Sequence, residues 1–123
     1  MKREFIGMIG KLTCELAEEN GVVVVTVSGQ ADVYTSGELG KIMEAYLARG
    51  QTNILLDMEN LKYLDSSTLA ALLKIQKKAR AGGGNVKLLR LGSEPREVFE
   101  VSGFLNLFET FEDREVAISS FTN

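Results

Sequence analysis

The segment from residue 53 to residue 81 constrains the fold most, because its hydrophobic pattern changes from strand to helix at one point. Residues 54–56 (ILL) are consecutive apolar residues between polar ones, which predicts a short strand buried on both faces. A polar link follows, and from Ser66 onward apolar residues recur at helical spacing. The glycines at 82–84 end this helix, because glycine readily takes the left-handed conformation that terminates helices.

Four polar residues mark the start of this helix: Asp65, Ser66, Ser67 and Thr68. Asp65 stands at the N-cap position, where its carboxylate can accept backbone N–H groups of the first turn. Ser66 falls in that first turn, and a helix N-terminus tolerates an anion because its N–H donors are unpaired. A phosphate on this serine would add about −1.5 to −2 charges without melting the helix. Asp-Ser-Ser is also a common helix cap without further function, and spacing alone does not separate the two interpretations.

Length and charge narrow the class of protein. A chain of 123 residues is expected to form one domain, and a net charge of −3 argues against a general nucleic-acid binder. No apolar run approaches the roughly 20 residues that span a bilayer. The first residues are basic but lack a small-residue cleavage site, which argues against a signal peptide. We therefore expect a cytoplasmic protein that does not insert into membranes.

The residues that most often carry catalysis or bind metals are scarce. Histidine is absent, which removes the commonest general base and the commonest transition-metal ligand. Cys14 is the single cysteine, so no internal disulfide forms, which fits a reducing compartment. Cys14 alternates with polar neighbours and is expected to be a buried, inert thiol. We therefore expect no metal and no cofactor, and no catalysis that depends on histidine.

Turn and cap signals divide the rest of the chain. Asn20-Gly21 suits a tight hairpin turn, and Thr35 with Glu38 has the form of a capping box. The strands expected besides 54–56 are 12–17, 22–28, 86–91 and 107–111, with a loop at 29–34. The expected helices begin near residues 35, 66, 93 and 113, the last with Val116 and Ala117 on its inner face. A hairpin followed by alternating units implies an α/β fold with a mixed sheet of about five strands and four helices.

The first eleven residues have no clear hydrophobic period and are expected to form an N-terminal extension to a single domain at 12–121. A short helix, an extra edge strand and an apolar tail all fit this segment. The sequence also leaves open whether it mediates self-association as a homodimer.

Several segments together resemble the STAS domain family, and most closely its stand-alone bacterial anti-sigma factor antagonists. The segments that carry the resemblance are 29–32 (GQAD), 54–58 (ILLDM), 64–67 (LDSS), 87–91 (KLLRL) and 99–104 (FEVSGF). The resemblance covers about residues 12 to 121. It implies a STAS-like mixed sheet, with elements in the order strand, strand and then helix alternating with strand.

The resemblance also implies a non-catalytic, protein-binding switch. In the family, an anti-sigma factor that is also a serine kinase binds the unphosphorylated antagonist and phosphorylates the serine directly after the aspartate, which is Ser66 here. A serine phosphatase restores the unphosphorylated form. Asp32 would contact the kinase and Asp65 would orient Ser66. The partner-binding residues implied are Asp32, Asp65, Ser66, Ser67 and Thr68.

One residue departs from the family pattern, since Thr68 stands where glycine is usual. Threonine adds a β-branch at a point where glycine allows close approach of a partner. The second hypothesis is therefore a STAS scaffold subunit of a signalling or membrane-transport assembly without a phospho-switch. A third hypothesis, a receiver phosphorylated on Asp57 at a strand end, has less support, because the acidic pair and the lysine of such receivers are missing.

Overall fold

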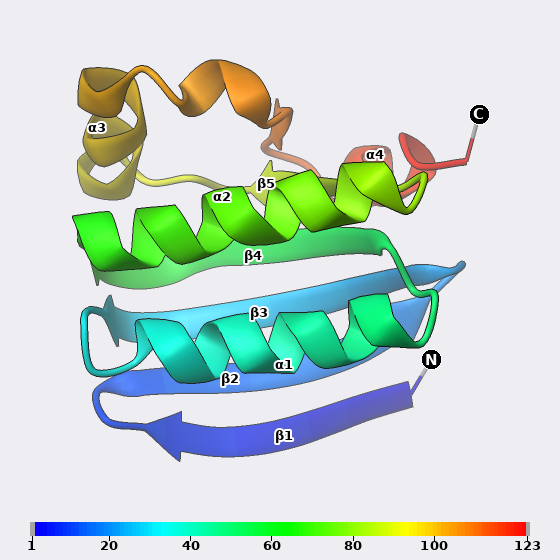
Figure 1. The fold of residues 1–123 in the computed structure, drawn as a ribbon, viewed down its shortest axis with the longest axis horizontal. Helices are drawn as coiled ribbons and strands as arrows, with labels where there is room; N and C mark the ends of the chain where they lie inside the picture. Colours follow the sequence, from blue (N-terminus) through cyan, green and yellow to red (C-terminus); the bar gives the residue numbers. More distant parts are fainter. Residues whose placement is uncertain (1, 123) are drawn as a thin grey trace.

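The computed structural model describes the backbone of residues 2–122 and the side chains of residues 10–122. These residues form one six-stranded sheet in the order β1-β2-β3-β4-β5-β6, with helices packed on it (Figure 1). The strands are β1 (Lys2–Ile9), β2 (Leu12–Glu19), β3 (Val22–Ala31), β4 (Asn53–Leu64), β5 (Asn85–Leu89) and β6 (Thr110–Phe111). The helices are α1 (Ser36–Ala48), α2 (Ser66–Ala81), α3 (Ser93–Ser102), the 3-10 helix η1 (Leu105–Leu107) and α4 (Arg114–Ser119).

The sheet is mixed, as the sequence predicts. β1, β2 and β3 pair antiparallel, while β3, β4, β5 and β6 pair parallel. Asn20 and Gly21 both take positive φ angles, of 52° and 79°, which is the conformation of a tight type I′ hairpin turn. The five expected strands are present, and the N-terminal segment adds β1 as a sixth, at the edge beside β2.

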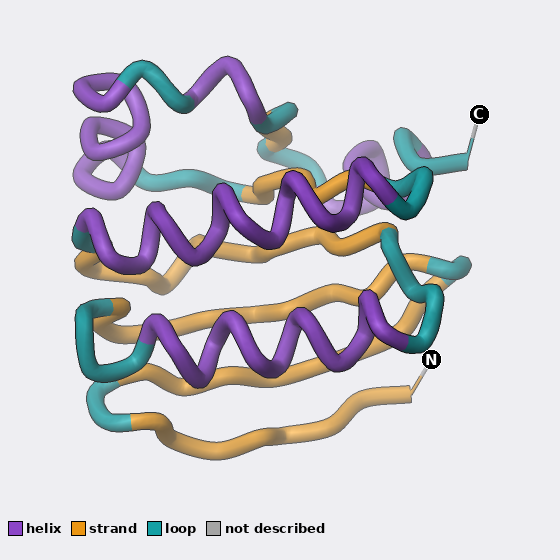
Figure 2. The backbone as a smooth tube through the Cα atoms, in the orientation of Figure 1, coloured by secondary structure: helices purple, strands orange, loops and turns teal. Residues whose placement is uncertain are grey.

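Helices α1 and α2 cover one face of the sheet, and α4 covers part of the other (Figures 1 and 2). The larger core lies between the sheet and helices α1 and α2. Alternate side chains of β2, β3 and β4 point into it. The smaller core packs Ala117 and Ile118 of α4 against Val24, Leu55 and Leu89. Residues 54–56 are therefore buried on both faces, as expected. Among the described residues, no helix is both long enough and apolar enough to cross a bilayer.

Two central strands are longer than the sequence predicts. The expected polar link after residue 56 belongs to β4, which continues to Leu64, and the expected loop at 29–34 begins only after Ala31. The two strands pair in parallel up to Ala31 and Leu64, with register shifts that absorb the polar residues. Hydrogen bonds between these strands, which sequence periodicity does not display, explain the extra length.

The C-terminal third also differs from the prediction. The expected strand at 107–111 is reduced to Thr110–Phe111, because η1 occupies the residues before it. In α4, Val116 is 57% exposed, and Ile118 points inward together with Ala117. The predicted inward position of Val116 is therefore wrong, because α4 turns Ala117 and Ile118, and not Val116, toward the sheet.

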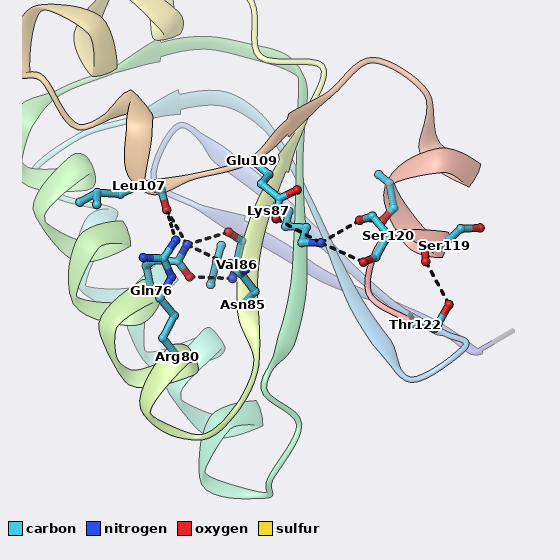
Figure 3. Close-up of polar contacts among 11 residues, drawn as sticks. Gln76, Arg80, Asn85, Val86, Lys87, Leu107, Glu109, Ser119, Ser120 and Thr122 are labelled. Atoms are coloured by element: carbon cyan, nitrogen blue, oxygen red, sulfur yellow. Dashed lines mark hydrogen bonds and ion pairs between the residues drawn. The ribbon is translucent and has the colours of Figure 1, made fainter.

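Two buried polar side chains hold this third in place (Figure 3). The amide of Gln76 donates to the carbonyl of Leu107 at 2.7 Å and accepts the N–H of Val86 at 2.7 Å. Lys87 donates to the backbone oxygen and the hydroxyl of Ser120 at 3.1 and 2.9 Å. Such bonds satisfy polar groups that would otherwise be costly to bury. They fasten the η1 segment to α2, and α4 to β5.

Candidate functional site

The candidate site lies where the two central parallel strands end. Ala31 and Leu64 are register partners at the ends of β3 and β4, so the next residues, Asp32 and Asp65, leave the sheet side by side. The backbone N–H of Asp65 donates to the carbonyl of Ala31 at 3.2 Å. Ser66 follows directly as the first residue of α2. The structure thus brings Asp32, Asp65 and Ser66 together at the C-terminal ends of two central parallel strands. Ligands commonly bind α/β folds at such strand ends.

Asp65 caps α2, which confirms the prediction from the sequence. Its backbone is extended, and its Oδ1 accepts the backbone N–H of Thr68 at 3.0 Å. The same oxygen accepts the hydroxyl of Thr68 at 3.2 Å. The first turn of the helix is therefore fixed by two hydrogen bonds to one carboxylate.

The four residues at this helix start differ in exposure. Ser66 is exposed, while Asp65 and Ser67 are partly buried. Thr68 is only 1% exposed, because its side chain points beneath Asp65. Thr68 therefore supports the cap from inside, and its side chain is not on the surface that a partner would touch.

The loop after β3 presents apolar side chains beside Ser66. Oδ1 of Asp32 accepts the backbone N–H of Tyr34 at 2.9 Å, which fixes the turn. The hydroxyl of Thr35 accepts the N–H of Asp32 at 2.9 Å and makes no cap bond to α1, so the predicted capping box with Glu38 is wrong. Thr35 is buried and holds the loop instead. As a result Val33 and Tyr34 stand 61% and 86% exposed.

A groove of about 410 Å³ opens on the other side of Ser66. Its walls come from the start of α2 and from α3, which contributes two carboxylates and apolar side chains. The lining residues are Ser66, Leu69, Glu94, Glu97, Val98, Val101 and Ser102. Sequence reasoning missed the part played by α3. The one available signal was Val101, an apolar residue on the outer side of a short polar helix, which is 81% exposed.

The other residues considered from the sequence lie away from this site. Asp57 is in the middle of β4, not at a strand end, and is buried in an ion pair with Arg90 at 3.6 Å. Cys14 is fully buried, and burial together with nearby Glu15 raises the pKa of its thiol to about 11, so it is inert. The described residues include no cluster of histidine, cysteine or carboxylate side chains able to hold a metal ion.

Known proteins resemble this chain along most of its length. The family model of the STAS domain matches residues 13–117. The chain is 31% identical over 111 residues to BtrV of Bordetella bronchiseptica, whose name places it among anti-sigma factor antagonists. This match covers 90% of the chain and 94% of the relative.

Two solved structures share the fold. An anti-sigma factor antagonist from Mycobacterium paratuberculosis superposes with a TM-score of 0.81 at 22% identity, over 91% of this chain and 95% of that one. The unphosphorylated form of the Bacillus protein SpoIIAA superposes with a TM-score of 0.77 at 24% identity, over 87% and 94%. At these identities the likeness shows the fold alone, and it confirms the mixed α/β architecture expected from the sequence.

Proposed function

The chain belongs to the STAS domain family, and on that premise we propose that it is an anti-sigma factor antagonist, a protein-binding switch without catalysis of its own. Its unphosphorylated form binds an anti-sigma factor that is also a serine kinase, and thereby frees a sigma factor. Phosphorylation of Ser66 by that kinase releases the complex, and a serine phosphatase reverses it. The observation that carries the proposal is the exposed Ser66 at the start of α2, between the Asp32 loop and the α3 groove.

The helix start suits a serine that is phosphorylated and dephosphorylated without refolding. Asp65 already holds the first turn through Thr68, so the helix does not depend on the hydroxyl of Ser66. The N-terminal dipole of a 16-residue helix favours an anion at this point. A phosphate there leaves α2 intact and changes only the charge and size of the exposed surface.

The surface around Ser66 suits a protein partner in its unmodified state. Val33 and Tyr34, in the loop after β3, and Tyr63, two residues before Asp65, are large side chains that are exposed. Exposed aromatic side chains near the centre of an interface often carry much of the binding energy. A partner packed against them would meet a bulky dianion once Ser66 is phosphorylated, and desolvating that charge would oppose binding.

The departure at Thr68 is compatible with this function. The added side chain is buried and hydrogen-bonded to Asp65, so it does not project toward a partner. Threonine also has a better helix propensity than glycine. The partner surface near Ser66 is therefore formed by Asp32, Asp65, Ser66 and Ser67, with Thr68 as internal support.

Binding to the cognate kinase, measured by calorimetry, tests the proposal. We expect Ser66→Ala to bind and to remain bound when ATP is added, whereas the wild type is phosphorylated and released. Ser66→Asp should weaken binding about 100-fold, or roughly 2.7 kcal/mol. Ser93→Asp is the matched control, because Ser93 is the exposed first residue of α3 and receives the same charge. Equal effects of the two aspartates, or release of Ser66→Ala by ATP, would contradict the switch.

A further inference from the structure

A second groove, of about 390 Å³, continues the first one along α2. It is lined by the C-terminal half of α2 and by the segment around η1: Leu73, Gln76, Lys77, Arg80, Phe104 and Leu107. In Figure 1, α3 lies above the start of α2, and the segment after it lies above the middle of the same helix. The two grooves are therefore consecutive parts of one face, which we call the α2–α3 face.

The spacing of the lining residues confirms that both grooves open on one side of α2. Ser66, Leu69, Leu73, Lys77 and Arg80 follow one another at intervals of three or four residues. Residues at these intervals lie on the same side of a helix. From Ser66 to Arg80 this side runs about 21 Å, at 1.5 Å per residue.

The two ends of this face carry opposite charges. The half next to Ser66 holds the carboxylates of Glu94 and Glu97 on α3. The other half holds the cations of Lys77 and Arg80 on α2. The neighbouring Lys78 belongs to another surface, because it pairs with Glu44 of α1 at 2.9 Å.

Exposed apolar side chains line both halves of the face, Val101 in the acidic half and Phe104 and Leu107 in the basic half. Val101, Phe104 and Leu107 are 81%, 39% and 38% exposed, and they are three of the seven large apolar side chains exposed among the described residues. A contiguous apolar patch rimmed by charges is typical of a protein interface. The α2–α3 face therefore has the composition of a binding surface along its full length.

The wall formed by η1 is fixed in place. The carbonyl of Leu107 accepts both the Gln76 amide, at 2.7 Å, and the Arg80 guanidinium, at 2.9 Å (Figure 3). Behind it, Phe99 and Phe108 pack edge to face, with ring centroids 5.5 Å apart. A rigid wall loses little conformational entropy on binding, which favours association.

We propose that the α2–α3 face binds a second copy of this chain in a two-fold symmetric dimer. In such a dimer the same surface meets itself with its ends exchanged. The acidic half of one copy then lies on the basic half of the other, so that Glu94 and Glu97 face the partner copy's Lys77 and Arg80. By the same exchange, Val101 of one copy faces Phe104 and Leu107 of the other.

The dimer has a consequence for the switch, and this consequence rests on the proposed function. Ser66 lines the acidic half, so the dimer covers it. A kinase that needs Ser66 therefore competes with self-association. The dimer would act as a reserve form that is protected from phosphorylation.

Sedimentation velocity of the full chain, from micromolar to millimolar concentration, tests the proposal without any kinase. We expect a reversible dimer that weakens with salt, because opposite charges meet across it. Lys77→Glu and Glu97→Lys should each raise the dimer Kd at least about tenfold, since each places like charges together twice. The double variant restores opposite charges and should return the Kd to within about threefold of wild type.

Lys41→Glu serves as the control, because Lys41 is exposed on α1, outside this face. It should leave the dimer unchanged, and thermal unfolding should show that every variant is folded. A wild-type chain that stays monomeric throughout would overturn the proposal. A double variant no better than the single ones would overturn it as well, and would point to a different protein as the occupant. Since no kinase enters this experiment, its failure leaves the switch at Ser66 standing.

Discussion

Helices α2 and α4 begin in the same way but lie in very different surroundings. Asp65 and Asp113 each occupy the N-cap with an extended backbone, and each accepts the backbone N–H of the residue three positions later at 3.0 Å. The two helix starts therefore share the same backbone capping bond, and only Asp65 also accepts a side-chain hydroxyl, that of Thr68.

What differs is the position of each cap in the sheet. Asp65 follows a central strand, is tied to the end of β3, and is followed by an exposed serine beside a groove. Asp113 follows the two-residue edge strand β6 and starts a helix of six residues. A cap thus predicts where a helix begins, whereas the ends of neighbouring parallel strands decide whether that helix start forms a site.

The largest expected effect comes from releasing α4 while leaving α2 untouched. Lys87 is 5% exposed, donates twice to Ser120 and lies 4.5 Å from the ring centroid of Phe121. Lys87→Met keeps most of the volume and removes these bonds, so we expect a loss of about 3 kcal/mol in the free energy of unfolding. Urea denaturation measures the loss, and the exposed Lys41→Met is the control. Weaker kinase binding in the folded Lys87→Met variant would show that α4 belongs to the site after all.

The two caps can be compared directly by removing each carboxylate. Asp65→Ala should cost about 2 kcal/mol, because it removes a cap and leaves the buried hydroxyl of Thr68 without its acceptor. Asp113→Ala should cost about 1 kcal/mol, since its carboxylate makes the cap bond to Val116 at an exposed position. Urea denaturation of both variants gives the difference. Equal losses would mean that Thr68 adds nothing to the cap of α2.

A smaller effect should follow from removing the Thr68 hydroxyl alone. Thr68→Val keeps the shape and the β-branch but cannot donate to Asp65, so we expect a loss of about 1 kcal/mol. Binding to the kinase should be unchanged, because this side chain is buried. Unchanged stability together with weaker kinase binding would place Thr68 in the interface instead.

The smallest expected effect on stability comes from removing the ion pair that links each helix to a neighbouring element, which is Lys78 with Glu44 for α2. Lys78 of α2 hydrogen-bonds to Glu44 and lowers the pKa of that carboxyl below its ordinary value of 4.5. A carboxyl with a lower pKa in the folded state stabilises the fold above its unfolded pKa, and loses this contribution as the pH falls through the folded value. The small Tm difference between wild type and Glu44→Gln should therefore shrink as the pH falls below 4.5 and disappear once the pH is below the folded pKa. For α4 the matching pair is Arg114 with Glu19 at 3.4 Å, and Glu19→Gln provides the comparison. A Tm difference for Glu44→Gln that persisted at low pH would show that packing, not charge, accounts for it.

Local patterns predicted much of the fold. Alternation located the strands of the hairpin, helical spacing located α1 and α2, and the Asp65 cap was readable because its partners lie within one turn. The extensions of β3 and β4 were not readable, since they depend on hydrogen bonds between strands far apart in sequence.

The same distinction applies to the candidate site. Ser66 and Asp65 could be identified from adjacent residues, and Asp32 from its family position. The role of Thr35 as a brace for the Asp32 loop was missed, because a capping box and this contact use the same residue types. Gln76 and the α3 wall of the groove were missed as well, since only the folded chain brings residue 76 to residue 107, and α3 to the start of α2.

Peptide mass spectrometry of the protein purified from its native cell tests the central claim most directly. Trypsin cleaves after Lys62 and Lys74, so one peptide holds Ser66, Ser67 and Thr68, and its fragment ions separate the three hydroxyls. We expect a species that is heavier by one phosphate on Ser66 and is converted back by a serine phosphatase. A peptide that stays unmodified under all growth and stress conditions would contradict the switch, and would leave Asp65 and Ser66 as a helix cap like that of α4.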